Sequence, residues 1–145
     1  MKWVIDASIA AKWLGPEIDS ALAVALLDDE LLAPDLLYPE VANILWKKRF
    51  RAELDAAAAS AGARWLLHAP IQVHACAELT TDALYLATHV QHTAYDCFYL
   101  ALARLAKCPF VTADRRLFER CQRTDTADLA ATVVLLPDAA MAARR

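Results

Sequence analysis

The chain has 145 residues, of which 59% are hydrophobic and 23% are charged, and its formal net charge is −3. This composition excludes an intrinsically disordered protein, and the length predicts one domain with a substantial core. No apolar run reaches the roughly 18 residues of a membrane-spanning helix, and no basic, cleavable leader precedes the first strand, so we expect a soluble, cytoplasmic protein. The net charge does not indicate nucleic-acid binding, although basic residues gather at 47–51 and 115–123.

The first predicted element is a short strand through Trp3–Ile5, which ends at Asp6. Aromatic and β-branched residues favour extended structure, and no polar residue alternates among them. This strand should therefore be covered on both faces, as in the middle of a parallel sheet. Ser8 is expected to cap a helix over residues 9–14, which ends at Gly15.

Helices and strands alternate along the rest of the chain. Hydrophobic periodicity predicts helices over residues 18–27, 39–51, 55–67, 76–91, 94–107 and 115–121. Short apolar runs predict further strands over residues 31–33, 71–73, 109–112 and 133–136. Residues 124–131 are expected to form a polar connection, and the residues after Pro137 are expected to fray.

This alternation predicts a three-layer α/β/α fold. The central parallel sheet should have about four to five short strands, flanked by about seven helices. The predicted single domain spans residues 1–137, and residues 138–145 form a C-terminal tail.

Four acidic residues are predicted to share one edge of this sheet. Asp6, Glu40 and Asp114 each follow a predicted strand, and Asp96 begins the helix that leads into the fourth strand. The carboxyl ends of parallel strands meet at one edge, where ligands bind in such folds. Each acid also has a local explanation, as a turn residue, a helix cap or a first-turn acid that complements the helix dipole. Their common placement favours a shared site over unrelated local roles.

Carboxylates gathered in one small volume would repel one another and raise each other's pKa values unless cations neutralised them. A ligand set made only of oxygens favours Mg²⁺ or Mn²⁺ over zinc. Such a site suits the hydrolysis of phosphodiester bonds, because divalent ions activate a water molecule and stabilise charge on the phosphate and the leaving oxygen. No covalent nucleophile is needed.

A more specific pattern is carried by the segments Val4–Ser8, Pro39–Asn43, Tyr95–Ala103 and Phe110–Leu117. In these segments the chain resembles the PIN-domain ribonucleases, and in particular the VapC-type toxins of bacterial toxin–antitoxin pairs. The resemblance covers nearly the whole chain and implies a PIN-like fold and a metal-dependent endoribonuclease that hydrolyses RNA phosphodiester bonds. The positions that it implies to be catalytic and metal-binding are Asp6, Glu40, Asp96 and Asp114, and those that it implies to support them are Ser8 and Thr112.

The resemblance implies a metal cofactor, and the oxygen ligands lead us to expect Mg²⁺, with Mn²⁺ as the alternative. Arg115 and Arg116 follow Asp114 where some PIN domains carry a further acid, so the sequence leaves open whether one or two ions bind. The partners implied are an RNA substrate, a second copy of the chain in a homodimer, and a cognate antitoxin that inhibits the toxin.

Basic and apolar residues near these acids are candidates for binding these partners. Lys47, Lys48, Arg115 and Arg116 are candidate contacts to RNA phosphates, although a solvated helix end also explains the lysines. An antitoxin segment would need an apolar groove near the site. The residues expected to line it are Leu14, Leu37, Val41, Leu45 and Trp46.

Other polar residues have ordinary interpretations. His89 and His92 are interpreted as surface or helix-end residues, because nothing else with zinc-ligand spacing accompanies them. Caps or surface positions are expected for Asp35, Asp55, Asp82 and Asp125.

Two further functions remain open on sequence grounds. A PIN nuclease of RNA maturation would carry the same acids, and a catalytically silent PIN module that binds RNA or protein would keep the fold. A phosphotransfer enzyme or receiver is disfavoured, because position 8 is Ser8 instead of the second acid of an Asp-x-Asp motif and no lysine follows the last strand.

Overall fold

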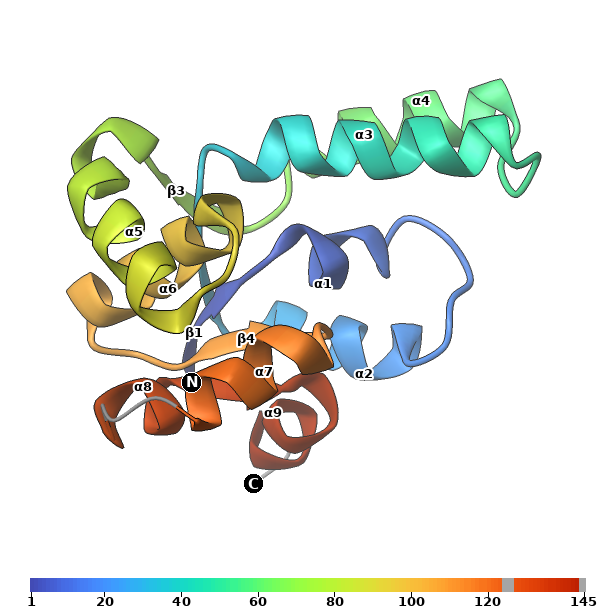
Figure 1. Cartoon of the computed structure of the whole chain (residues 1–145). Coiled ribbons are helices and arrows are strands. Elements are labelled where there is room, and N and C mark those ends of the chain that lie inside the picture. Colours follow the sequence, from blue (N-terminus) through green and yellow to red (C-terminus); the bar gives the residue numbers. More distant parts are fainter. Residues whose placement is uncertain (124–126, 144–145) are drawn as a thin grey trace.

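The computed structural model of the chain describes residues 1–123 and 127–143 (Figure 1). In these residues, five strands form one parallel sheet in the order β3-β2-β1-β4-β5. The strands are β1 (Lys2–Ile5), β2 (Glu30–Pro34), β3 (Ile71–His74), β4 (Phe110–Thr112) and β5 (Val133–Leu135). All the predicted strands are therefore confirmed, and β1 lies in the middle of the sheet.

Helices lie on both faces of the sheet, which confirms the predicted three-layer architecture. The described helices are α1 (Ala7–Ala11), α2 (Ser20–Val24), the 3₁₀ helix η1 (Ala25–Asp28), α3 (Leu37–Phe50), α4 (Ala56–Leu66), α5 (Cys76–Val90), α6 (Ala94–Ala106), α7 (Arg115–Gln122), α8 (Ala127–Thr132) and α9 (Leu136–Ala143). Helix α6 packs on β1, β2 and β4, whereas η1 packs on β2 and α9 packs on β4 and β5. The crossovers from β1 to β2 and from β3 to β4 run in opposite directions along the sheet and, being right-handed, place η1 and α6 on opposite faces. Helix α9 packs on η1 and so lies on the same face as η1.

The first strand is covered on both sides, as its composition predicts. Trp3, Val4 and Ile5 are buried, with 2%, 0% and 0% of their surfaces exposed. Helices α3 and α4 pack side by side and extend beyond the sheet as a long hairpin, cyan to green in Figure 1. None of the described helices is both long enough and apolar enough to cross a membrane.

Helix α1 begins earlier than predicted, because Asp6 and not Ser8 is its N-cap. The Asp6 carboxylate accepts a hydrogen bond from the backbone N–H of Ile9 at 3.1 Å, and the helix ends at Ala11. Asp caps helices as well as Ser does, so both residues fit the pattern equally. The prediction of Ser8 as a cap is wrong, and its hydroxyl is left to bind Asp6.

Two helices occupy the C-terminal segments for which no helix is predicted. Helix α8 lies within the expected polar connection, and residues 124–126, which include Asp125, are outside the described residues. Helix α9 occupies the described part of the expected tail, with Ala139 and Ala140 buried. Pro137 lies in its first turn, where a helix needs no backbone N–H. The expectation of a frayed tail is therefore wrong for residues 138–143.

Candidate active site

Carboxyl groups from different elements line one cleft of about 260 Å³. They belong to Asp6 after β1, Glu40 in the first turn of α3, Asp96 in the first turn of α6 and Asp114 at the N-cap of α7. Strands β1 and β4 are neighbours in the sheet and point the same way, so the residues after them meet at one edge. The structure therefore brings together all the acids that the sequence singles out.

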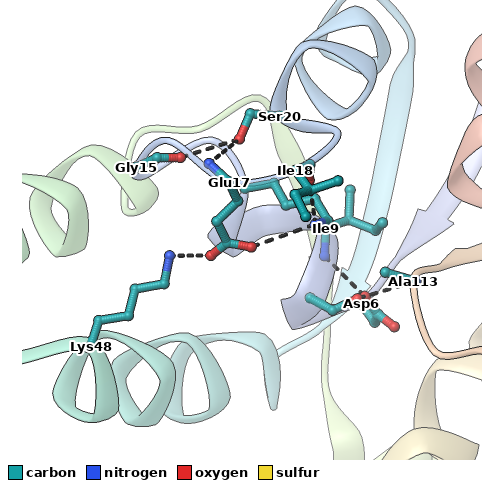
Figure 2. Close-up of polar contacts among 10 residues, drawn as sticks. Asp6, Ile9, Gly15, Glu17, Ile18, Ser20, Lys48 and Ala113 are labelled. Atoms are coloured by element: carbon teal, nitrogen blue, oxygen red, sulfur yellow. Dashed lines mark hydrogen bonds and ion pairs between the residues drawn. The ribbon is translucent and has the colours of Figure 1, made fainter. Parts of the chain in front are cut away.

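Asp6 is the buried acid of this cleft, with 6% of its surface exposed. Its Oδ1 accepts hydrogen bonds from the Ser8 hydroxyl at 2.5 Å and from the Ile9 N–H at 3.1 Å, and Figure 2 shows the latter. Its Oδ2 accepts a hydrogen bond from the Thr112 hydroxyl at 2.5 Å. Burial raises the pKa of Asp6 to about 6, the three hydrogen bonds oppose this rise, and the charge of Asp96 adds to it. A nearby cation would offset the lost solvation.

Ser8 and Thr112 connect Asp6 to the end of β4. The Ser8 hydroxyl accepts the Ala113 N–H at 3.3 Å, and the Thr112 hydroxyl accepts the Asp114 N–H at 3.0 Å. Because each hydroxyl oxygen accepts a backbone hydrogen bond, its own proton is directed to Asp6. The two hydroxyls thus fix the carboxylate of Asp6 relative to Asp114.

Glu40 is held by a buried tyrosine that the sequence pattern did not single out. The hydroxyl of Tyr99 on α6 donates a hydrogen bond to Oε2 of Glu40. Tyr99 is fully buried and stacks on Phe110 of β4, with ring centroids 5.8 Å apart. Burial raises the pKa of Glu40, the Tyr99 hydrogen bond opposes this rise, and the charges of Asp96 and Asp6 add to it. The sequence offers one indication of this contact, because Tyr99 lies in an apolar stretch of its helix. A tyrosine hydroxyl buried there needs a hydrogen-bond partner.

Asp96 and Asp114 approach each other around His92. Oδ2 of Asp96 accepts a hydrogen bond from the Thr93 hydroxyl at 2.7 Å, and Oδ1 of Asp114 accepts one from the Arg116 N–H at 2.8 Å. Nε2 of His92 is 2.9 Å from Oδ2 of Asp96 and 4.0 Å from Oδ2 of Asp114. His92 lies just after a helix end, as expected, but its side chain is 14% exposed and faces the acids. Its i, i+4 spacing to Asp96 is the signal that could have placed it here.

The predicted basic residues separate into different surroundings. Lys47 lines the cleft of the acids. Lys48 instead forms an ion pair with Glu17, shown in Figure 2, and its side chain is 13% exposed. Arg115 borders a small cavity on another side of α7, and Arg116 lines a larger cavity of about 550 Å³.

The expected apolar groove is not formed by the residues predicted for it. Leu37, Val41 and Leu45 belong to the buried core, because the inner face of α3 packs on the rest of the domain, and Leu14 is partly buried against this core. Trp46, on the outer face, is 60% exposed and stacks on the exposed Phe50. The exposed apolar surface of α3 is therefore formed by these two aromatic residues.

The donor set of the cleft fits a divalent cation. Its lining holds the carboxylates of Asp6, Glu40, Asp96 and Asp114 and, as a positive group, only Lys47 among the described residues. In addition, one ligand atom each from His92, Asp96 and Asp114 lies within 4.8 Å of the others. Closely spaced carboxylates with so little neutralising charge are characteristic of sites for Mg²⁺ or Mn²⁺.

Comparison with known proteins shows where this arrangement belongs. The family model of the PIN domain matches residues 3–123. The chain belongs to the PIN-domain family. All the acids of the cleft lie within the matched part of this PIN domain. Ribonuclease VapC3 of Pyrobaculum aerophilum is 38% identical to it over 124 residues, which cover 83% of this chain and 95% of the relative.

Solved structures share the fold of this PIN domain, and two of them serve as examples. The crystal structure of PAE2754 from Pyrobaculum aerophilum superposes with a TM-score of 0.71 at 20% sequence identity. The match covers 99% of this chain and 96% of the PAE2754 chain. A chain of a toxin–antitoxin complex from Klebsiella pneumoniae superposes with a TM-score of 0.63 at 13% sequence identity. The match covers 92% of this chain and 96% of that chain. These likenesses confirm the predicted PIN-like fold.

Proposed function

We propose that this PIN domain is a metal-dependent endoribonuclease and the toxin of a toxin–antitoxin pair. The convergence of Asp6, Glu40, Asp96 and Asp114 on one cleft carries the proposal. Two relatives support it, because VapC3 is named a ribonuclease and the Klebsiella pneumoniae structure is a toxin–antitoxin complex. On this proposal the protein hydrolyses RNA in the cytoplasm and a cognate antitoxin inhibits it.

The cleft acids would hold Mg²⁺, or Mn²⁺ as the alternative, through carboxylate oxygens. An ion bound there would lower the pKa of a water molecule and neutralise charge on the scissile phosphate. Ser8 and Thr112 orient Asp6 through hydrogen bonds of 2.5 Å each. Burial and the charges of Asp96 and Asp6 raise the pKa of Glu40 in the metal-free protein, and a cation bound beside this carboxylate would offset the rise.

Cleavage of cellular RNA by the purified protein tests this function. We expect phosphodiester cleavage in Mg²⁺ or Mn²⁺ that stops when a chelator is added. In cells, expression of the chain should arrest growth, and coexpression of the product of the neighbouring gene should relieve the arrest. Cleavage that survives the chelator would contradict the metal site. Cleavage without growth arrest would favour the nuclease of RNA maturation, and an absence of cleavage would favour the silent binding module.

A basic groove beside the cleft provides a path for the RNA strand. We define it by the arginines of the 550 Å³ cavity, Arg116, Arg120 and Arg123, which outnumber the one acid of its lining, Glu119. The backbone N–H of Arg116 donates a hydrogen bond to the Asp114 carboxylate, so the groove adjoins the cleft. Lys47 stands at the cleft itself, from α3. An RNA backbone held by these arginines and Lys47 would pass the acids, and phosphate contacts of this kind carry no base specificity.

Replacing Arg116 with glutamine should weaken RNA binding to a similar extent for different RNA sequences. Loss of one phosphate contact should also lower the slope of log affinity against log salt by about 0.7. Fluorescence anisotropy with labelled single-stranded RNA, in chelator to prevent cleavage, measures both quantities. Arg104→Gln is the matched control, because Arg104 lies 3.6 Å from Asp128 and lines a different cavity. If both variants lost RNA affinity equally, this result would contradict the proposal that RNA binds in the basic groove.

The partner surfaces are also part of the proposal. We propose a homodimer, as the resemblance implies, and sedimentation analysis would distinguish it from a monomer. The aromatic pair of Trp46 and Phe50 has ring centroids 5.9 Å apart, and Phe50 is 81% exposed. Exposed aromatic side chains in contact with each other favour protein binding, so α3 is our candidate for a contact with the antitoxin.

A further inference from the structure

His92 lies in the turn between α5 and α6, and the backbone of this turn is held on both sides. Gln91 ends α5 in the left-handed conformation, with φ 53°, and the His92 N–H donates to the Ala87 carbonyl at 3.2 Å. The Arg120 guanidinium donates a hydrogen bond to the Gln91 carbonyl. This bond ties the turn to α7, the helix that Asp114 begins. The imidazole is therefore presented from an ordered position and not from a mobile loop.

The Nε2 atom of His92 is enclosed by acids without being hydrogen-bonded to them. It lies 2.9 Å from Oδ2 of Asp96 and 4.0 Å from Oδ2 of Asp114. Within the described residues, however, Nε2 is buried with no partner in hydrogen-bond geometry. The nearby Asp96 oxygen already accepts the Thr93 hydroxyl at 2.7 Å. A buried ring nitrogen without a hydrogen bond is costly, so the arrangement points to a ligand between these groups.

The surrounding donor atoms define what that ligand is. Oδ1 of Asp114 is used in capping α7, where it accepts the N–H groups of Arg116 and Leu117, and Oδ2 is the atom nearer to His92. The ligand atoms of His92, Asp96 and Asp114 lie within 4.8 Å of one another. Atoms that share one ion at about 2.1 Å lie about 3 to 4 Å apart, so small side-chain movements bring these donors around a single cation.

We infer that His92 is a nitrogen ligand of the metal site beside Asp96 and Asp114, and that it makes the site prefer a transition-metal ion such as Mn²⁺ over Mg²⁺. Magnesium takes oxygen ligands and keeps its waters, whereas an imidazole nitrogen favours the softer transition-metal ions. Asp6 and Glu40 supply only oxygen, so the nitrogen enters the site from the side of α5 and α6. This inference rests on the proposed nuclease site and specifies its metal.

Mn²⁺ is paramagnetic, so electron spin echo measurements on the Mn²⁺-loaded protein detect a coordinated nitrogen directly. The wild-type chain should show the modulation of a ¹⁴N imidazole ligand, and growth on ¹⁵N-labelled histidine should replace it with the ¹⁵N pattern. This comparison needs no substitution and therefore does not depend on a variant that folds. His92→Gln should remove the modulation. The matched control His89→Gln, which changes an exposed histidine of α5, should keep it.

Calorimetric titration with the metals alone separates the role of His92 from the existence of the site. His92→Gln should weaken Mn²⁺ binding about 10-fold and change Mg²⁺ binding by less than about 2-fold. His92→Leu, checked for folding by circular dichroism, should behave in the same way. Mn²⁺ that binds without nitrogen modulation, or affinities for both ions that fall together, would overturn the role of His92 and leave the proposed nuclease intact. A protein that binds neither ion would overturn both.

Discussion

Replacing Asp6 with asparagine should lower the rate of RNA cleavage by about 10³-fold or more at saturating Mg²⁺. Asp6 is held at the end of the central strand by the hydroxyls of Ser8 and Thr112, and it is the buried acid of the cleft. Asparagine keeps the size of the side chain, and its carbonyl oxygen can still accept a hydrogen bond from one of these hydroxyls, but it removes the charge that would hold an ion. Single-turnover cleavage of an end-labelled RNA measures the effect.

Asp82→Asn provides the matched control for this change. Asp82 is exposed on α5 and undergoes the same loss of charge outside the cleft. This variant should cleave at the wild-type rate, and Mg²⁺ should raise its melting temperature as it does that of the wild type. An Asp6→Asn variant that keeps either the cleavage or the stabilisation by Mg²⁺ would remove Asp6 from the proposed metal ligands.

The same substitution should stabilise the metal-free protein at neutral pH. Burial raises the pKa of Asp6 from 3.8 to about 6, so the folded state binds its proton more tightly than the unfolded state does. The resulting stabilisation is complete below about pH 4 and is lost as the pH rises to about 6. Above that pH, the buried charge costs about 3 kcal/mol relative to a neutral side chain. The amide that replaces the carboxylate carries no charge at any pH and avoids this cost.

Urea unfolding in the presence of a chelator measures this effect. The free energy of unfolding of Asp6→Asn, relative to the wild type, should rise by about 1 kcal/mol between pH 5 and pH 7. Asp82→Asn should follow the wild type across this range. A divalent ion should raise the free energy of unfolding of the wild type and leave that of Asp6→Asn unchanged. With the ion present, the wild type should therefore be the more stable of the two. A difference that does not vary with pH would contradict the raised pKa of Asp6.

Local patterns predict most of the fold. The strand through Trp3–Ile5 is apolar on both sides, and this places it in the centre of the sheet, where it is found. The segments Ala127–Thr132 and Leu136–Ala143 are not predicted as helices, because six and eight residues hold too few large apolar side chains to show a helical period. Their stability comes from Leu129 and Leu136, which are buried against the domain.

The acids of the site were predictable for a different reason. Asp6 and Asp114 follow neighbouring parallel strands, and that topology brings strand ends to one edge whatever the details of packing. Tyr99 and Lys48 were not predictable in the same way. Tyr99 binds Glu40 from 59 residues away, and Lys48 binds Glu17 from 31 residues away. Such pairs depend on how helices pack over the sheet, and no local pattern encodes that distance.

The sequence by itself therefore determined the order of strands and helices along the chain, the edge at which the acids gather and the family to which the chain belongs. Tertiary structure alone decided how those acids are held. The supporting role of Ser8 was implied by the resemblance, and the structure shows its contact, a hydrogen bond donated to Asp6. The structure also shows that Lys48 forms an ion pair with Glu17 and that His92 faces Asp96. The physical reason is that hydrophobic periodicity sets the position of each element, whereas the direction of a polar side chain depends on the groups that distant elements bring within about 3 Å of it.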